Sequence, residues 1–134
     1  MVPYNERVLA AFGGGTVHFC GSAKHQIDNL AAMKNCSGIN NFLMDDIEQG
    51  LMLRDRFKGR GAVMLCDYNA VDIKRQCERW KLALNDAGSV IANMSVAPRM
   101  ALVDGKYLES DRTREEIVSA YMDYLGPWME RDQT

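Results

Sequence analysis

A histidine and a cysteine stand two residues apart in a short apolar segment near the start of the chain. His18 and Cys20 belong to the run GGGTVHFCG, residues 13–21, in which residues 16–20 are typical of a buried strand. Side chains two residues apart leave a strand from the same face, so the imidazole and the thiol should lie side by side. An imidazole and a thiolate held so close would form half of a soft-metal site. The alternative is a buried cysteine beside a hydrogen-bonded core histidine.

Polar or reactive side chains also follow each later strand-like segment. Functional groups of parallel α/β proteins gather at the carboxyl ends of the strands, where helix N-termini and free backbone amides converge. The residues at these positions are Lys24 and His25 after the first segment, Asp45 and Asp46 after the second, Cys66 and Tyr68 after the third, and Asn93 in the fourth. We expect substrate-binding roles for Lys24, His25, Tyr68 and Asn93.

Asp45 and Asp46 are adjacent carboxylates with two interpretations. In the first, one caps the helix that follows and the other is solvated. In the second, one of them lies in the mouth of the site as a catalytic acid or base, or as an outer partner of His18.

Strand and helix patterns alternate four times along the chain. Strands are predicted at residues 16–20, 39–43, 62–66 and 90–94. Two helices are predicted at residues 24–34 and 71–86. A third begins at Asp45 or Asp46 and ends at the glycines at positions 59 and 61, and a fourth begins at Thr113. Alternation of this kind implies parallel strands joined by right-handed crossovers. We therefore predict an α/β fold of four consecutive βα units in a single domain, residues 1–134, equivalent to half of a (β/α)8 TIM barrel.

Local signals add detail to this outline. Asp104 and Gly105 stand between apolar flanks and predict a hairpin, and Thr113 with Glu116 predicts a capping box. Gly126 and Pro127 should break or kink the last helix, whose apolar face is expected to carry Ile117, Tyr121, Tyr124 and Trp128. The helix at 71–86 should bury Ile73, Cys77, Trp80 and Leu84.

Four segments in order, GGGTVHFCG, INNFLMDD, VMLCDYNA and SVIANMSVAP, resemble the second half of the uroporphyrinogen decarboxylase superfamily over residues 12–125. The resemblance implies the C-terminal half of a (β/α)8 barrel. It also implies one of two activities. The first is transfer of a methyl group from a corrinoid protein to a thiol or folate acceptor with zinc, and the second is decarboxylation of a porphyrinogen without metal. A non-catalytic half-barrel module is a third hypothesis.

The zinc methyltransferases of this superfamily use His-x-Cys at the first of these strands and a further cysteine after the last strand. His18 and Cys20 match the pair, whereas the last segment, ANMSVAP, contains no cysteine. Cys66, at the end of the third strand, is the substitute that we predict as the third zinc ligand. Cys36 and Cys77 are interpreted as core residues. The decarboxylase resembles this chain at residues 91–93 and then has Gly-His-Gly where residues 95–97 read Ser-Val-Ala.

The composition of the chain limits the cellular location and the kinds of partner that we expect. The chain of 134 residues has a net charge of −2 and an isoelectric point near 5.7, so neither nucleic acid nor an anionic membrane is an expected partner. No signal peptide or membrane span is evident, and we expect reduced cysteines and a cytoplasmic protein. Four parallel strands with helices on one face would leave Val17 or Ile91 open to water, which predicts a homodimer or a complementary N-terminal barrel half as partner.

Overall fold

The structure is a computed structural model that describes residues 2–42, 46–67, 71–85, 90–94, 99–103 and 106–133. The chain divides into two compact units. The first comprises Met1–Cys66 with Asp86–Asn93, and the second comprises Asp67–Asn85 with Met94–Thr134.

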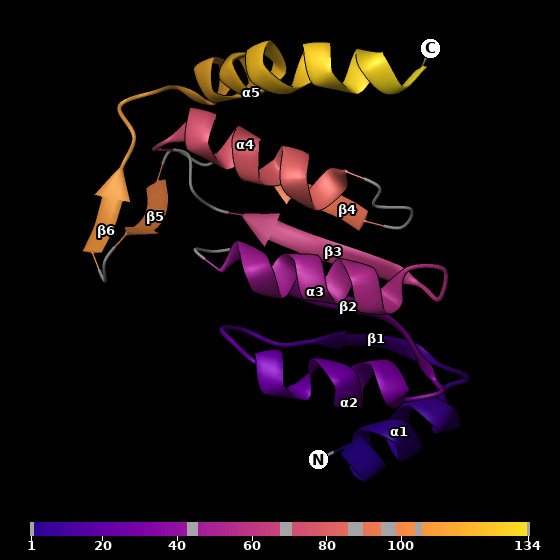
Figure 1. The fold of residues 1–134 in the computed structure, drawn as a ribbon. Helices are drawn as coiled ribbons and strands as arrows, with labels where there is room; N and C mark the ends of the chain where they lie inside the picture. Colours follow the sequence, from indigo (N-terminus) through magenta and orange to yellow (C-terminus); the bar gives the residue numbers. More distant parts are fainter. Residues whose placement is uncertain are drawn as a thin grey trace. The chain divides into compact units, whose positions relative to one another are not determined.

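A four-stranded parallel sheet organises the first unit. Its strands are β1 (Gly15–His18), β2 (Cys36–Phe42), β3 (Ala62–Asp67) and β4 (Val90–Met94), and their order in space follows the order in sequence (Figure 1). A helical segment connects β1 to β2 and another connects β2 to β3, as parallel pairing requires. The predicted α/β class and the alternation of strands and helices are confirmed, and β4 has the predicted bounds.

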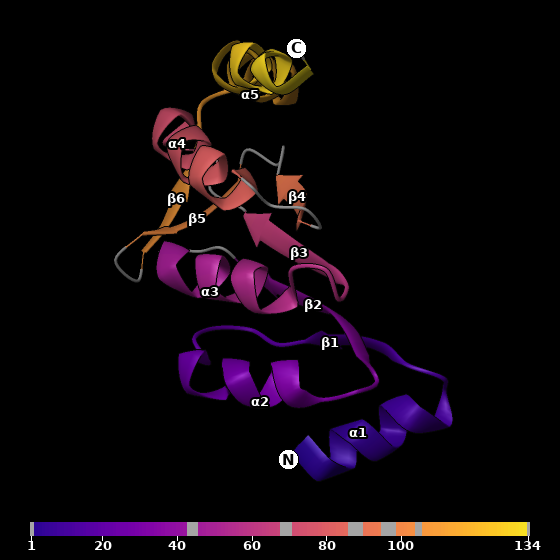
Figure 2. The same cartoon turned by 45° about the vertical axis from the view of Figure 1, so that its right-hand side comes forward.

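The helical segments of the first unit are α1 (Val2–Ala11), the 3-10 turn η1 (Lys24–Gln26), α2 (Ile27–Ala32) and α3 (Ile47–Phe57). α2 and α3 lie on the same side of the sheet in both ribbon views (Figures 1 and 2). The predicted helix at 24–34 is therefore shorter and begins as a 3-10 turn. Asp46 is the N-cap of α3 and its carboxylate accepts a hydrogen bond from the Gln49 backbone at 3.2 Å, which confirms one of the two predicted caps.

The hydrophobic pattern does not predict α1, because none of its side chains is buried. A polar contact holds this helix to the rest of the unit. The Glu6 carboxylate accepts hydrogen bonds from the Asn35 backbone at 3.2 Å and from the Asn35 side chain at 2.7 Å. A polar residue, Glu6, thus anchors α1 to the rest of the unit.

The core of the first unit lies between the sheet and the helices on one of its faces. Its fully buried side chains are Ile27, Ile39, Leu53, Phe57, Val63 and Leu65. Strand neighbours alternate between faces, so Ile39 faces the helices while Asn40 faces the other way. Val17 pairs with Ile39 and is half-buried on the helix side. The expectation that it opens to water is therefore wrong, whereas Ile91 is 48% exposed.

The second unit contains α4 (Ile73–Leu84), β5 (Arg99–Val103), β6 (Lys106–Glu109), α5 (Arg114–Met129) and the 3-10 turn η2 (Glu130–Gln133). β5 and β6 pair antiparallel, which confirms the hairpin, although its turn, residues 104–105, lies outside the described residues. α4 contacts α5 and buries Ile73, Cys77 and Trp80 as predicted, whereas Leu84, predicted with them, is only partly buried. Burial raises the pKa of the Cys77 thiol to about 11, as expected for a core cysteine.

The capping box of α5 is confirmed, and the predicted break at Gly126 and Pro127 is wrong, whereas a kink there stays a prediction. Thr113 Oγ1 accepts from the Glu116 backbone at 3.2 Å, and the Glu116 carboxylate accepts from the Thr113 backbone at 2.7 Å. The helix continues through Pro127 to Met129. Proline in the last turn removes one amide donor and leaves little helix beyond it to disrupt. Leu125 takes the buried position after Ile117 and Tyr121, because helical spacing of four residues turns Tyr124 outward.

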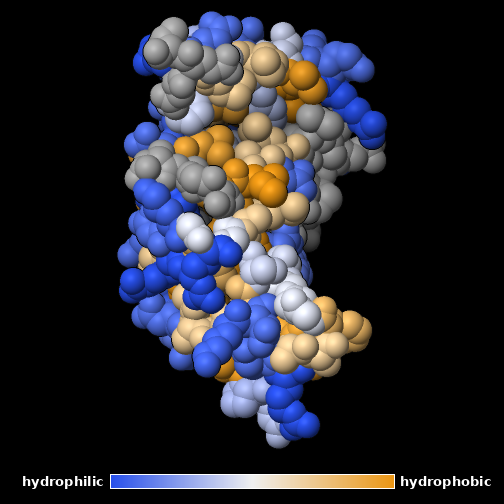
Figure 3. Space-filling view, turned by 90° about the vertical axis from the view of Figure 1, so that its right-hand side faces the viewer, coloured by the Kyte–Doolittle hydropathy of each residue, from blue (hydrophilic) through white to orange (hydrophobic). Residues whose placement is uncertain are grey.

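None of the described helices is long and apolar enough to span a membrane. On the face of the molecule seen in Figure 3, hydrophilic and hydrophobic side chains are interleaved.

Candidate functional site

The predicted pair of His18 and Cys20 is in contact, but the two residues reach each other differently from the prediction. β1 ends at His18, two residues earlier than expected. The last ladder-like bond beyond it runs from the Phe19 amide to the Asn40 carbonyl at 3.2 Å, and Gly21 turns the chain at φ 74°. Cys20 therefore lies in a loop. Its Sγ is 3.3 Å from His18 Nε2, and Cys20 is exposed.

Asn40 on β2 holds the other side of the imidazole. Asn40 is the register partner of His18, and its Oδ1 contacts His18 Nδ1. The Asn40 amide nitrogen donates to Cys66 Sγ at 3.5 Å, which orients the carboxamide. Since a carboxamide oxygen can only accept, Nδ1 must donate to it, and in the neutral imidazole Nε2 then presents its lone pair to Cys20. A lone pair in this position can bind a metal or accept the thiol proton.

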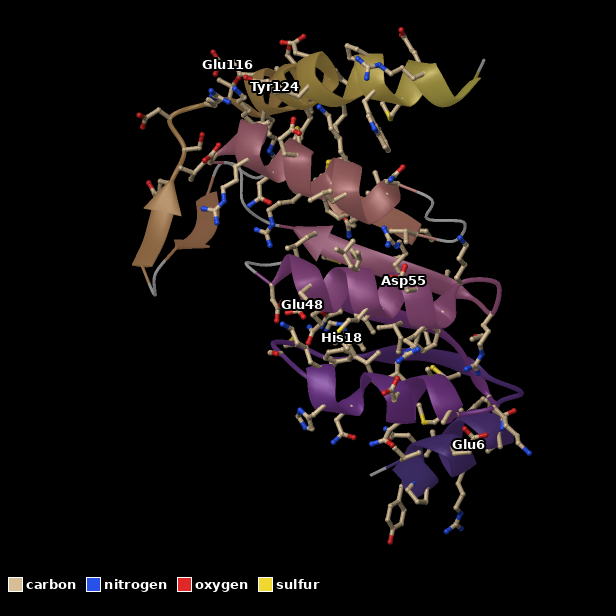
Figure 4. All side chains as sticks on the ribbon, in the orientation of Figure 1. Glu6, His18, Glu48, Asp55, Glu116 and Tyr124 are labelled. Atoms are coloured by element: carbon tan, nitrogen blue, oxygen red, sulfur yellow. The ribbon has the colours of Figure 1, made fainter. Side chains whose placement is uncertain are left out.

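Cys66 lies farther along the same row of side chains. It is 4% exposed, and its Sγ also accepts from Asn93 Nδ2 at 3.6 Å. His18, Asn40, Cys66 and Asn93 thus form a polar row on the face of the sheet opposite α2 and α3, one residue from each strand. Figure 4 labels His18 at the β1 end of this row. We call these four residues, with Cys20, the polar row.

The geometry fits two corners of a zinc site. An Nε2 to Sγ distance of 3.3 Å suits adjacent ligands of a tetrahedral ion with bonds of ~2.0 Å to nitrogen and ~2.3 Å to sulfur. The Asn40 carboxamide contacts both His18 and Cys66, and the role of Cys66 as third ligand stays a prediction. Within the described ranges, no group of three or more His, Cys, Asp or Glu side chains is placed to hold a metal ion.

Lys24 and Asp46 make an ion-pair cluster near the start of α3. Lys24 Nζ is 3.0 Å from Asp46 Oδ1 and also contacts the carboxylate of Glu48, a residue that the sequence did not single out. Hydrogen bonds to Glu48 and then to Asp46 raise the pKa of Lys24. Figure 4 labels Glu48 on α3. The carboxylate of Asp46 is thus engaged by the helix cap and by a cation.

The remaining predicted residues lie apart from the polar row or outside the description. His25 is exposed on η1 and borders a surface hollow lined also by Val2, Pro3, Gln26 and Asn29. Asp45 and Tyr68 lie outside the described residues. The structure therefore brings together His18, Cys20, Cys66 and Asn93, and it places Lys24 with Asp46 in a separate cluster.

Asn40 is the site residue that sequence reasoning missed. Its signal was a pair of asparagines, Asn40 and Asn41, inside the otherwise apolar run INNFL, since a polar side chain within a buried strand needs a partner. Comparison of the chain with protein-family models, with curated proteins and with solved structures gives no significant match. The geometry and the residues of the polar row are therefore the basis for a functional assignment.

Proposed function

We propose that this chain is a half-barrel of the uroporphyrinogen decarboxylase type that transfers a methyl group from a corrinoid-type donor to a thiol or folate acceptor. The observation that carries the proposal is the contact between His18 Nε2 and Cys20 Sγ. In support, the four parallel strands present their carboxyl ends together, where functional groups of barrels gather.

Zinc bound at this pair would lower the pKa of an acceptor thiol, so that the thiol attacks as thiolate. In the proposed function His18 Nε2 and Cys20 Sγ hold the ion. Asn40 fixes the tautomer and orientation of His18, a role that outer residues commonly have at zinc sites. The third ligand in this proposal is Cys66, and the fourth position is left open for the acceptor.

The other predicted residues keep the roles predicted for them from the sequence. Asn93 is a candidate for substrate binding because it borders Cys66 in the polar row, and Lys24, His25 and Tyr68 are further candidates. Of the two carboxylates, we propose Asp45 as the acid or base, since the cap of α3 and the ion pair with Lys24 engage Asp46. The corrinoid would be bound to a partner protein.

Metal analysis of protein purified without added zinc tests this proposal. We expect about one zinc per chain, because His18 and Cys20 form a preoriented pair of ligands. His18→Ala and Cys20→Ser should lose the metal, whereas Cys36→Ser, which removes a buried thiol, should keep it. Asn40→Ala should weaken zinc binding by about 10- to 100-fold.

Other outcomes favour the remaining hypotheses. Zinc retained in both His18→Ala and Cys20→Ser would contradict the proposed site. Absence of metal together with binding of a tetrapyrrole would favour porphyrinogen decarboxylation. Absence of both would favour a non-catalytic module.

We also propose that a second copy, or a separate N-terminal barrel half, covers the face of the sheet opposite α2 and α3. Ile91 is 48% exposed on this face, and parallel sheets usually bury both faces. Light scattering of the isolated chain should give twice its 15.1 kDa mass, with an interface above ~2,000 Å2 in total. A stable monomer that unfolds cooperatively would argue against a half-barrel.

A further inference from the structure

The loop that carries Cys20 rests on two buried carboxamides. The first belongs to Asn41, the next residue along β2 after Asn40, whose side chain is 1% exposed. Its Nδ2 donates to the Phe19 carbonyl at 2.8 Å and lies 3.5 Å from the Gly21 carbonyl. These two carbonyls flank Cys20 on either side. Asn41 therefore holds the backbone of the loop at both neighbours of the thiol.

The second carboxamide is Gln49, in the first turn of α3, which is 2% exposed. Its Nε2 donates to the Gly21 carbonyl at 3.0 Å and to Asn41 Oδ1 at 2.8 Å, and its Oε1 accepts from the Ala23 amide at 2.6 Å. Both donor hydrogens and the acceptor of Gln49 are used. Gln49 thus connects the loop, the strand and the helix.

These contacts replace the strand pairing that the loop lacks. β1 ends at His18, and Gly21 has an open position in which a Cβ would meet no atom within 4 Å. Gly21 has no side chain that could hold the loop in place. The hydrogen bonds that its carbonyl accepts from Asn41 and Gln49 hold it instead. Buried carboxamides are costly unless every group is paired, so Asn41 and Gln49 also favour one loop conformation over others.

We propose that Asn41 and Gln49 are positioning residues that hold Cys20 against His18 Nε2. Successive residues of β2 then orient the two members of the pair from opposite faces of the sheet. Asn40 orients the imidazole and Asn41, with Gln49, orients the thiol. The inference rests on the proposed function in one respect, which is that Cys20 is the functional thiol.

Alkylation of Cys20 by iodoacetamide, in the presence of a chelator, tests this inference independently of zinc. Because the contact with His18 Nε2 orients the Cys20 thiol, His18→Gln should slow alkylation of Cys20 by roughly 10-fold, at the weak end of the effect of a positioned side chain on a reacting group. Gln49→Glu keeps the acceptor for Ala23 but places a carboxylate oxygen against two oxygens that now receive hydrogen bonds. It should release the loop and slow alkylation to a similar extent.

The double variant separates positioning from general destabilisation. If Gln49 acts through the contact between Cys20 and His18, then His18→Gln with Gln49→Glu should be no slower than His18→Gln alone. Leu53→Ala removes a core side chain from the same helix and should alkylate at the wild-type rate while it is folded. Gln49→Met, of similar length and without the hydrogen bonds, replaces Gln49→Glu if that variant does not fold.

Three results would overturn the inference: a wild-type rate in His18→Gln, a wild-type rate in both folded Gln49 variants, or additive slowing in the double variant. None of them depends on metal content, so failure of the zinc proposal would leave the test intact.

Discussion

Replacing Gly61 with alanine should unfold the first unit. A Cβ built on Gly61 would overlap the carbonyl oxygen of Ser37 on β2, and the Ser37 carbonyl carbon lies almost as close. Both obstacles are backbone atoms, so no side chain can rotate to make room. The adjacent pair, Gly38 and Ala62, is in register between β2 and β3, and a Cβ on Gly38 would come within 2.6 Å of the Ala62 carbonyl oxygen.

Relief of this overlap requires β2 and β3 to separate where their pairing begins. We expect a loss of more than ~4 kcal/mol, in the range of the most disruptive single substitutions, against a total stability of about 5–15 kcal/mol for a typical domain. Chemical denaturation followed by circular dichroism measures the loss.

Gly126→Ala is the matched control for this glycine substitution. Gly126 is inside α5, and a Cβ there meets nothing within 4 Å. Alanine is favoured over glycine in helices by ~1 kcal/mol, so the control should be neutral or more stable. Wild-type stability in Gly61→Ala would mean that β2 and β3 are farther apart than the structure places them.

Trp80→Ala should destabilise the second unit by about 3–5 kcal/mol, the usual cost of removing a large buried aromatic side chain. Trp80 is 0% exposed and lies on the buried face of α4. Zinc content per folded molecule should not change, because Trp80 is not one of the proposed zinc ligands. Thermal unfolding and metal analysis of the same sample measure both quantities.

Leu82 provides the comparison on the same helix. It is 55% exposed, so Leu82→Ala should change stability by no more than ~0.5 kcal/mol. If Trp80→Ala and Leu82→Ala were equally stable, the assignment of the buried face of α4 would be wrong.

The strands were the most predictable part of the fold. Each of the four parallel strands was predicted from a short, mostly apolar run between turn residues, although β2 begins at Cys36, three residues before the predicted segment. The helices were predictable where one face is buried, as in α4, and α1 was not, because a glutamate contact rather than apolar burial holds it. The end of α5 was misjudged because the cost of a proline depends on its distance from the helix end, which the sequence pattern does not show.

The site was predictable to the extent that its residues are close in sequence. The contact between His18 and Cys20 could be predicted from their spacing of two residues. The contact of His18 with Asn40 depends on the register between β1 and β2, which is a tertiary property that local spacing does not reveal. The registers of β1 with β2 and of β2 with β3 bring the Asn40 carboxamide into contact with both His18 and Cys66, which the list of strand-end residues could not show.

Binding of a ligand to the polar row would also be coupled to folding of the sheet. His18, Asn40, Cys66 and Asn93 come from four different strands, so the full row exists only when the whole sheet is assembled. A ligand that contacts the row across several strands would bind the native chain and not the unfolded one. At one hundred times its Kd, such a ligand would add about 2.7 kcal/mol to the free energy of unfolding. The melting temperature of the sheet would then rise with the fraction of chains that have ligand bound, whatever the chemical identity of the ligand.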